Sequence, residues 1–155
     1  MCIRDRLERE PQLAALAAEN IARNDLASRV RVVTGVVGAP AAELRAMDLV
    51  EESFGHVIAN PPYHDSDAGT LPPDPLKAGA HAMPDTELDD WARFMARMTA
   101  SGGEATIIHK ADALARLLAV LDARFGALKV LPLHPRAGAP AHRVLVQGIL
   151  SLIHI

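Results

Sequence analysis

The chain has 155 residues, half of them hydrophobic, which is enough for about one domain with a buried core. No run approaches the roughly 18 consecutive apolar residues of a membrane helix, so the composition excludes a spanning protein. The chain has 16 Lys and Arg residues and 19 Asp and Glu residues, a net charge of -3. Any contact with nucleic acid must therefore be made by a local basic patch. The single cysteine, Cys2, excludes an internal disulfide framework and favours a reducing, cytoplasmic setting.

The two ends of the chain are predicted to be foreign to the gene. The codons CTG TCT CTT ATA CAC ATC encode Leu150 to Ile155, and their reverse complement contains ATG TGT ATA AGA GAC, which encodes Met1 to Asp5. This DNA word resembles a transposase-type sequencing-library adaptor. We therefore expect residues 1–6 and 150–155 to be translated adaptor, and residues 7–149 to be a partial domain whose gene continues beyond both ends. Ordinary termini are the alternative.

Hydrophobic spacing predicts alternating helices and strands, the pattern of a parallel α/β sheet. The expected helices cover residues 11–25, 41–47, 87–99 and 112–125, and the expected strands cover residues 29–34, 54–59, 105–109, 127–133 and 142–147. Gly102-Gly103 is expected to stop the third helix, and the turn-rich residues 135–140 predict an antiparallel pair of strands at the end. Residues 64–84 are predicted to form a long loop because they are rich in Pro, Asp and Gly.

The third expected helix carries an apolar stripe that is typical of a helix packed on a core. Its residues are Leu88, Trp91, Phe94, Met95 and Met98.

Asn60-Pro61-Pro62-Tyr63 is the motif that points to chemistry. It follows the strand expected at residues 54–59, and ligands of open parallel sheets bind beyond the carboxyl ends of the strands. The prolines end the strand because they lack an N–H and have a fixed φ. A rigid strand-ending turn with a solvent-facing Tyr63 is the purely structural alternative.

These four residues resemble the N-P-P-Y signature of class I S-adenosylmethionine-dependent methyltransferases that modify planar nitrogens, either a base amine or the side-chain amide of glutamine. The resemblance is strongest to bacterial valine-tRNA (adenine-N6) methyltransferases and covers the segment from Glu8 to Gln147. The other stretches that carry it are Glu8-Arg9-Glu10-Pro11 with Asn20 and Asn24, His56-Val57-Ile58-Ala59, Lys77 with His81, Ile107-Ile108-His109-Lys110, and Pro135-Arg136-Ala137-Gly138 with His142-Arg143-Val144-Leu145-Val146.

The resemblance implies an α/β, Rossmann-like sheet, mostly parallel with a C-terminal antiparallel hairpin, that lacks the family's first strand and glycine-rich loop. Because that strand is central in the family, we expect Phe54 to Ala59 to form an unpaired edge that invites aggregation. We also expect the 155-residue chain to fold poorly and to be inactive on its own.

The resemblance also implies the site. Asn60, Pro61, Pro62 and Tyr63 would be catalytic: the Asn60 side-chain oxygen and the Pro61 carbonyl accept the two N–H bonds of the target nitrogen, and Tyr63 stacks on its planar group. A base within structured RNA would first be flipped outward. The implied cofactor residues are Glu8, which holds the ribose hydroxyls, with Gly35, Val36 and Asn60. The implied substrate-binding residues are Tyr63, Lys77, His81, His109, Lys110, Arg136 and Arg143.

The chain differs from the family pattern in two places, and three functions are considered. The glycine-rich loop is absent, and Val36 stands where the family usually has an acid for the adenine amine. The reaction implied is methyl transfer from S-adenosylmethionine to adenine N6 of tRNA, favoured by Lys77 and His81. Glutamine N5 methylation of a release factor and a catalytically inactive binding domain are the alternatives. No metal is expected, because methyl transfer from a sulfonium needs none, and no membrane partner is expected.

Overall fold

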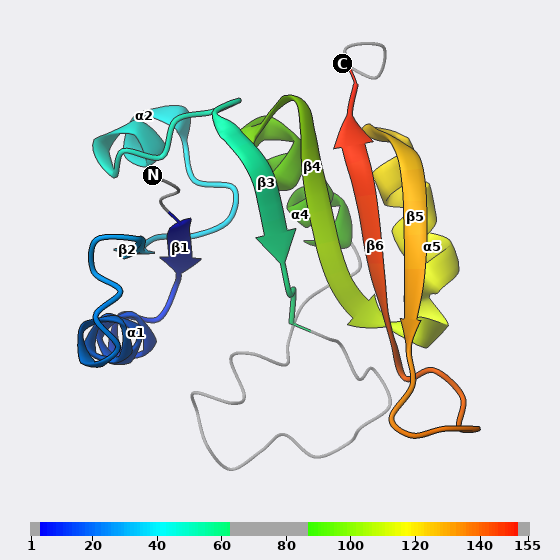
Figure 1. Ribbon diagram of the computed structural model, residues 1–155. Coiled ribbons are helices and arrows are strands. Elements are labelled where there is room, and N and C mark those ends of the chain that lie inside the picture. Colours follow the sequence, from blue (N-terminus) through cyan, green and yellow to red (C-terminus); the bar gives the residue numbers. More distant parts are fainter. Residues whose placement is uncertain (1–3, 63–86, 152–155) are drawn as a thin grey trace. The chain divides into compact units, whose positions relative to one another are not determined.

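The computed structural model describes residues 4–62 and 87–151 (Figure 1). The chain divides into two compact units, Met1–Val50 and Glu51–Ile155, and each unit contains its own sheet. The split follows from the strand pairing, because no ladder of hydrogen bonds joins the two described sheets.

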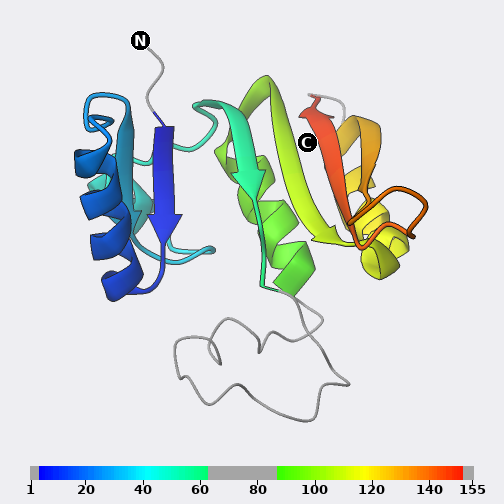
Figure 2. The same ribbon diagram turned by 60° about the horizontal axis from the view of Figure 1, so that its bottom comes forward.

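The first unit is a β-α-β arrangement followed by a short helix. It contains β1 (Arg4–Glu8), α1 (Pro11–Arg23), β2 (Val30–Thr34) and α2 (Ala41–Ala46). The two strands are parallel, with Arg4 opposite Val30 and Glu8 opposite Thr34, and α1 runs alongside them (Figure 2). Pro11 opens α1, as its fixed φ favours at a first-turn position.

The apolar pattern of α1 is only partly used for packing. Ala14 is the buried residue of this helix, whereas Leu13 and Leu16 are 38% and 52% exposed. A sheet of two strands is too narrow to cover the whole apolar stripe of a helix, so these leucines stay at the surface.

The second unit contains a four-stranded sheet with two longer helices. Its elements are β3 (Phe54–Ala59), α4 (Glu87–Met98), β4 (Thr99–Lys110), the 3-10 turn η1 (Ala111–Ala113), α5 (Leu114–Asp122), β5 (Phe125–Leu133) and β6 (Arg143–Leu150). The strand order is β3-β4-β6-β5. β3 and β4 are parallel, while β6 is antiparallel to both β4 and β5, which confirms the predicted C-terminal hairpin.

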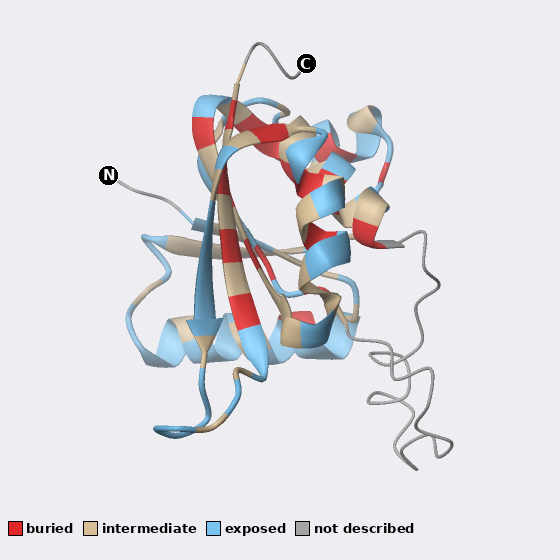
Figure 3. Ribbon diagram, turned by 90° about the vertical axis from the view of Figure 1, so that its right-hand side faces the viewer, coloured by how far each residue is buried: buried red, intermediate tan, exposed pale blue. Residues whose placement is uncertain are grey.

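One face of this sheet is covered by α4 and α5, and the core lies between them. The buried positions alternate along the strands and face the helices (Figure 3). Ile107, Val146 and Phe125 are fully buried on the sheet side, and Met95 and Leu117 meet them from the helices. Leu88 and Met95 of the stripe predicted on residues 87–99 belong to this core, and Trp91 packs at its border. Met98 is buried outside this cluster, and Phe94 is half-buried.

The opposite face of the sheet carries the alternate residues of each strand. No helix of the second unit, within residues 51–62 and 87–151, packs on this face. β3 lies at the edge of the strand order, as expected from the resemblance, and its Ile58 is 74% exposed. Among the described helices, none is both long and apolar enough to cross a membrane.

Gly102 and Gly103 do not end the helix as predicted, because both lie inside β4. The helix ends at Met98, and the Thr99 hydroxyl donates a hydrogen bond of 2.7 Å to the Met95 carbonyl oxygen. A Cβ on Gly103 would lie 2.8 Å from the Ala100 carbonyl oxygen and 3.1 Å from that of Gly55. This glycine therefore permits a close backbone approach inside the strand, which sequence reasoning mistook for a helix stop.

The chain ends take part in the sheets. Arg4, Asp5 and Arg6 belong to β1, and Leu150, 3% exposed, closes β6. Strand pairing uses backbone N–H and C=O groups, so translated adaptor and native residues can pair equally well. Their assignment as translated adaptor stays a prediction.

A bulge in β5 gives Gly148 a structural role. The register between β5 and β6 shifts between Gly126 and Lys129, and Ala127 there has a φ of 52°. A Cβ on Gly148 would lie 2.7 Å from both the Phe125 Cβ and the Leu128 Cδ2. The bulge thus places the Phe125 and Leu128 side chains against Gly148, where a Cβ would otherwise lie.

We predict that Gly148→Ala lowers the free energy of unfolding by about 1–3 kcal/mol, because the added methyl group overpacks a full core. Gly55→Ala is the matched control, since a Cβ there meets nothing within 4 Å. Urea denaturation of both variants measures the difference. Equal stability of the two variants would contradict the packing assigned to Gly148.

Candidate functional site

In the first unit, the predicted cofactor residues meet at the carboxyl end of the β1–β2 pair. Glu8 ends β1, and Gly35 and Val36 directly follow β2. The Gly35 N–H donates to the Glu8 carbonyl oxygen at 2.9 Å, which holds the two segments together. The structure therefore brings Glu8, Gly35 and Val36 to one edge, as the resemblance implies.

The Glu8 carboxylate is oriented by its chain neighbours. Its Oε1 accepts a hydrogen bond from the Glu10 N–H at 3.2 Å, and its Oε2 accepts one from Arg6 at 3.2 Å. The side chain is 17% exposed, so these contacts fix it without closing it off. A partly exposed carboxylate with free lone pairs can accept further hydrogen bonds from hydroxyl groups.

Gly35 lies in a tight place beside this carboxylate. A Cβ on it would lie 3.0 Å from the Leu7 Cδ1 and 3.1 Å from the Met47 Cε. Both neighbours are flexible side-chain ends, so glycine here permits a close approach without being strictly required. Val36 is 44% exposed and offers no polar side-chain group.

In the second unit, Asn60-Pro61-Pro62 follows β3 at the carboxyl end of the parallel β3–β4 pair. Ala59 is opposite Ile107 in the ladder, so Asn60 leaves the sheet next to Ile108. Asn60 is exposed, whereas Pro61 is buried and Pro62 is partly buried. The buried Pro61 fixes the backbone next to the exposed Asn60 side chain.

His109, Lys110 and Arg143 gather near the same edge of the four-stranded sheet. Lys110 is opposite Arg143, and His109 is opposite the buried Val144, in the β4–β6 ladder. Arg136 lies in the turn between β5 and β6. These four predicted substrate residues thus share one end of the sheet with Asn60.

The remaining predicted site residues, Tyr63, Lys77 and His81, lie outside the described residues. Within residues 4–62 and 87–151, no group of three or more His, Cys, Asp or Glu could hold a metal ion.

Burial lowers the pKa of His109 below its ordinary value of 6.5, and a hydrogen bond with the Lys110 backbone and the charge of Asp112 oppose this only in part. His109 is therefore held in its neutral form inside the helix-covered side of the sheet.

We predict that the free energy of unfolding falls as the pH is lowered from about 7 to about 5. The unfolded chain binds a proton at His109 first, at a pKa near 6.5, so acidification favours unfolding from there downward until the folded form is protonated too. Thermal melting across this range, with His109→Gln beside the wild type, measures the effect. The variant is expected to lose part of the pH dependence, and an unchanged slope would contradict this assignment.

The structure also reveals features that sequence reasoning missed. On the face of the sheet without helices, the His56 Nε2 lies 2.9 Å from the Thr106 hydroxyl, and Gln147 donates to Glu104 at 3.2 Å. These residues are far apart in sequence, and only the register of three strands brings them into one row.

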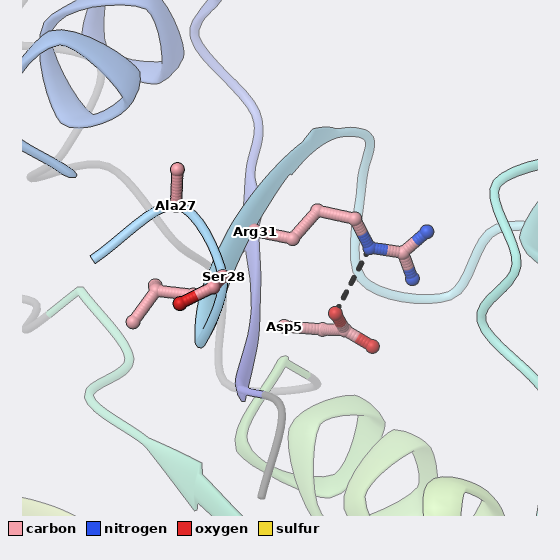
Figure 4. A pocket seen from close by; sticks show the side chains of 5 residues that line it. Asp5, Ala27, Ser28 and Arg31 are labelled. Carbon is pink, nitrogen blue, oxygen red and sulfur yellow. Dashed lines mark hydrogen bonds and ion pairs between the residues drawn. The ribbon is translucent and has the colours of Figure 1, made fainter. Parts of the chain in front are cut away.

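A hollow of about 440 Å³ in the first unit is the second such feature. Figure 4 shows its lining, and the Arg31 Nε donates to Asp5 at 2.9 Å beside it. The lining residues are Asp5, Ala27, Ser28, Val30 and Arg31. The hollow lies toward the amino ends of β1 and β2, the end opposite to that at which open parallel sheets bind ligands. We therefore assign it no part in the candidate site.

Comparison with known proteins identifies the fold. No protein-family model and no curated protein matches the chain. Among solved structures, a predicted O-methyltransferase from Agrobacterium tumefaciens is similar with a TM-score of 0.70 and 28% identity over 94% of this chain and 61% of its own. A tRNA (m1A58) methyltransferase from Aquifex aeolicus has a TM-score of 0.60 and 14% identity over 94% of this chain and 52% of its own.

An N-methyltransferase from Bradyrhizobium japonicum is also similar, with a TM-score of 0.61 and 12% identity over 95% of this chain and 72% of its own. The fold is therefore the Rossmann-like α/β fold of class I S-adenosylmethionine-dependent methyltransferases. The chain spans about three fifths of the length of the Agrobacterium protein. The structural relatives differ in the atoms that they methylate, so the fold by itself does not identify the acceptor.

Proposed function

We propose that the protein is part of an S-adenosylmethionine-dependent N-methyltransferase whose acceptor is adenine N6 in tRNA. The observation that carries the proposal is Asn60-Pro61-Pro62 at the carboxyl end of β3, with the fold of class I methyltransferases around it. The Aquifex aeolicus relative acts on tRNA, which supports an RNA acceptor for this fold.

The residues at the end of β1 fit a ribose. A ribose presents two neighbouring hydroxyl donors, and the partly exposed Glu8 carboxylate offers acceptors that the Glu10 and Arg6 contacts already orient. The Gly35 N–H holds the backbone after β2 against the Glu8 carbonyl oxygen, next to this carboxylate. Val36 does not fit the adenine amine, because it has no polar side-chain atom, so the backbone around it would have to supply that contact.

The Asn60-Pro61 backbone would then orient the acceptor. The lone pair of an aromatic amine is delocalised into its ring, so the nitrogen becomes a nucleophile only when its two N–H groups are held to favour a pyramidal geometry. The Asn60 side-chain oxygen and the Pro61 carbonyl are the two acceptors that we assign to this task. S-adenosylmethionine, when bound, supplies an electrophilic methyl group.

Asn60 and Pro61 would hold the acceptor nitrogen so that its lone pair points at this methyl group, and the proton that the nitrogen gives up would pass to water. Asn60 and Pro61 would contribute in two ways: they orient the nitrogen toward the methyl group, and they stabilise the positive charge that develops on it. Tyr63 is proposed to stack on the base, with Lys77, His81 and His109 as further substrate contacts.

We predict that Glu8→Gln weakens S-adenosylmethionine binding about tenfold or more, because a charge-assisted hydrogen bond is lost. Glu10→Gln, two residues away and paired only with Arg9 through its side chain, is the matched control and should bind normally. Calorimetric titration is the measurement. Since the chain spans 61% of its Agrobacterium relative, both variants are made in the 155-residue chain and in a version extended upstream by the genomic sequence.

Binding by the extended protein alone would support the proposal that the glycine-rich loop lies upstream. Absence of binding in both forms would contradict the proposed cofactor and favour an inactive domain.

We predict that Asn60→Ala, made in the version extended upstream, lowers methyl transfer to tRNA by about 10²–10³-fold, as expected when an oriented hydrogen-bond partner of the reacting group is lost. The assay follows a tritiated methyl group at saturating S-adenosylmethionine, so that weaker cofactor binding does not account for the loss. Gln12→Ala removes an exposed amide from α1 and serves as the control.

Full activity of Asn60→Ala would remove this residue from the mechanism. Transfer of the label to a release-factor glutamine and not to RNA would replace adenine by the glutamine alternative.

A further inference from the structure

Four polar side chains, the sheet-face cluster, form a connected row on the face of the four-stranded sheet opposite to the helix-packed core. They come from three neighbouring strands: His56 from β3, Glu104 and Thr106 from β4, and Gln147 from β6. Side chains alternate along a strand, so this row points away from the buried Ala105 and Ile107 of the core. The proposed methyl transfer uses none of the four residues.

Thr106 and His56 have the geometry of a nucleophile and its general base. The Thr106 Oγ1 lies 2.9 Å from the His56 Nε2, which is hydrogen-bond distance. On the other side of the ring, the His56 Nδ1 lies 3.6 Å from the Glu104 Oε2. An ionised carboxylate only accepts hydrogen bonds, so it favours the proton on Nδ1 and leaves the Nε2 lone pair for the Thr106 proton. A hydroxyl, an imidazole and a carboxylate in this order are the parts of an acyl-transfer triad.

Gln147 holds the carboxylate and brings an amide next to the hydroxyl. Its Nε2 donates a hydrogen bond of 3.2 Å to the same oxygen of Glu104. Gln147 is also the direct partner of Thr106 in the β4–β6 ladder, so their Cβ atoms are about 5 Å apart. A side-chain amide has two N–H groups, and the second can donate to an oxyanion that forms beside the Thr106 hydroxyl.

An apolar surface borders the hydroxyl. Ile58 is the ladder neighbour of Thr106 on β3 and is 74% exposed. Ile108, two residues further along β4, projects from the same face. Exposed apolar side chains next to a nucleophile suit an apolar acyl group. The His56 and Glu104 side chains are 43% and 42% exposed, so a substrate can reach the cluster from solution.

We propose that the sheet-face cluster hydrolyses carboxylic esters that have an apolar acyl group. This activity needs no S-adenosylmethionine and none of the residues at the carboxyl ends of β1 and β3, so it is independent of the proposed methyl transfer. Water weakens electrostatic stabilisation at an open site, so the rates are expected to be modest.

The proposed reaction has two steps. The Thr106 Oγ1 forms a bond to the ester carbonyl carbon while its proton passes to the His56 Nε2, and the carbonyl oxygen takes the π electron pair and accepts the Gln147 N–H. The bond from this carbon to the alcohol oxygen then breaks, and the alcohol leaves with the proton from His56. Water hydrolyses the acyl-threonine by the same route, so one ester and one water give one carboxylic acid and one alcohol.

The test is hydrolysis of p-nitrophenyl butyrate by the 155-residue chain, followed by the absorbance of p-nitrophenolate without S-adenosylmethionine. We expect Thr106→Val and His56→Gln each to lower kcat/KM about tenfold or more, because they remove the nucleophile and its base. Thr106→Ser keeps a hydroxyl and is expected to retain activity. Mass spectrometry of the acid-quenched protein is expected to find the butyryl group on Thr106.

His142→Gln is the matched control, because it removes another exposed imidazole of the second unit from outside the cluster. Thermal melting checks that each variant keeps the stability of the unaltered chain. An equal loss of activity in the control would overturn the proposal, because it would show hydrolysis by surface imidazoles in general. Full activity of Thr106→Val would overturn it, as would a rate of the unaltered chain no higher than that of free imidazole at the same concentration.

Discussion

Parallel pairing of β3 with β4 is the constraint on which the candidate site depends. The ladder places Ala59 opposite Ile107, and both residues are buried against the helices. A shift of one residue would turn this apolar set toward the other face, so burial fixes the register. The same register determines where Asn60 leaves the sheet and which residue of β4 lies beside it.

The two faces of the four-stranded sheet differ: one is apolar and the other carries polar and charged side chains. One face is apolar and packed, and His109, whose pKa is lowered by burial, lies on this face near the end of the sheet that carries Asn60. The other face has a row of polar contacts from His56 to Gln147 near its middle and a pair of cations at the carboxyl end. Alternation of side chains along strands is sufficient to build both faces from the same segments.

Most elements could be predicted from local pattern because their apolar spacing is regular. The bounds of β3 agree with the expectation, and α4 buries Leu88 and Met95 of its predicted apolar stripe in the core. Local pattern failed where a distant neighbour determines the conformation. Gly103 looks like a helix stop, yet it lies within β4, where the Gly55 carbonyl oxygen of the neighbouring strand leaves no room for a Cβ. Leu16 matches a core position but is exposed, because its sheet is too narrow to cover it.

The residue order is enough to predict the chemical types of the candidate site: an amide and two prolines after a strand, and an acid at Glu8. The α/β class could also be predicted, because it follows from the order of helical and strand patterns along the chain. Only the tertiary structure decided that Lys110 and Arg143 are opposed across two strands and that Glu8 is held beside Gly35. Such relations depend on strand register, which is set by burial of side chains from segments far apart in the sequence.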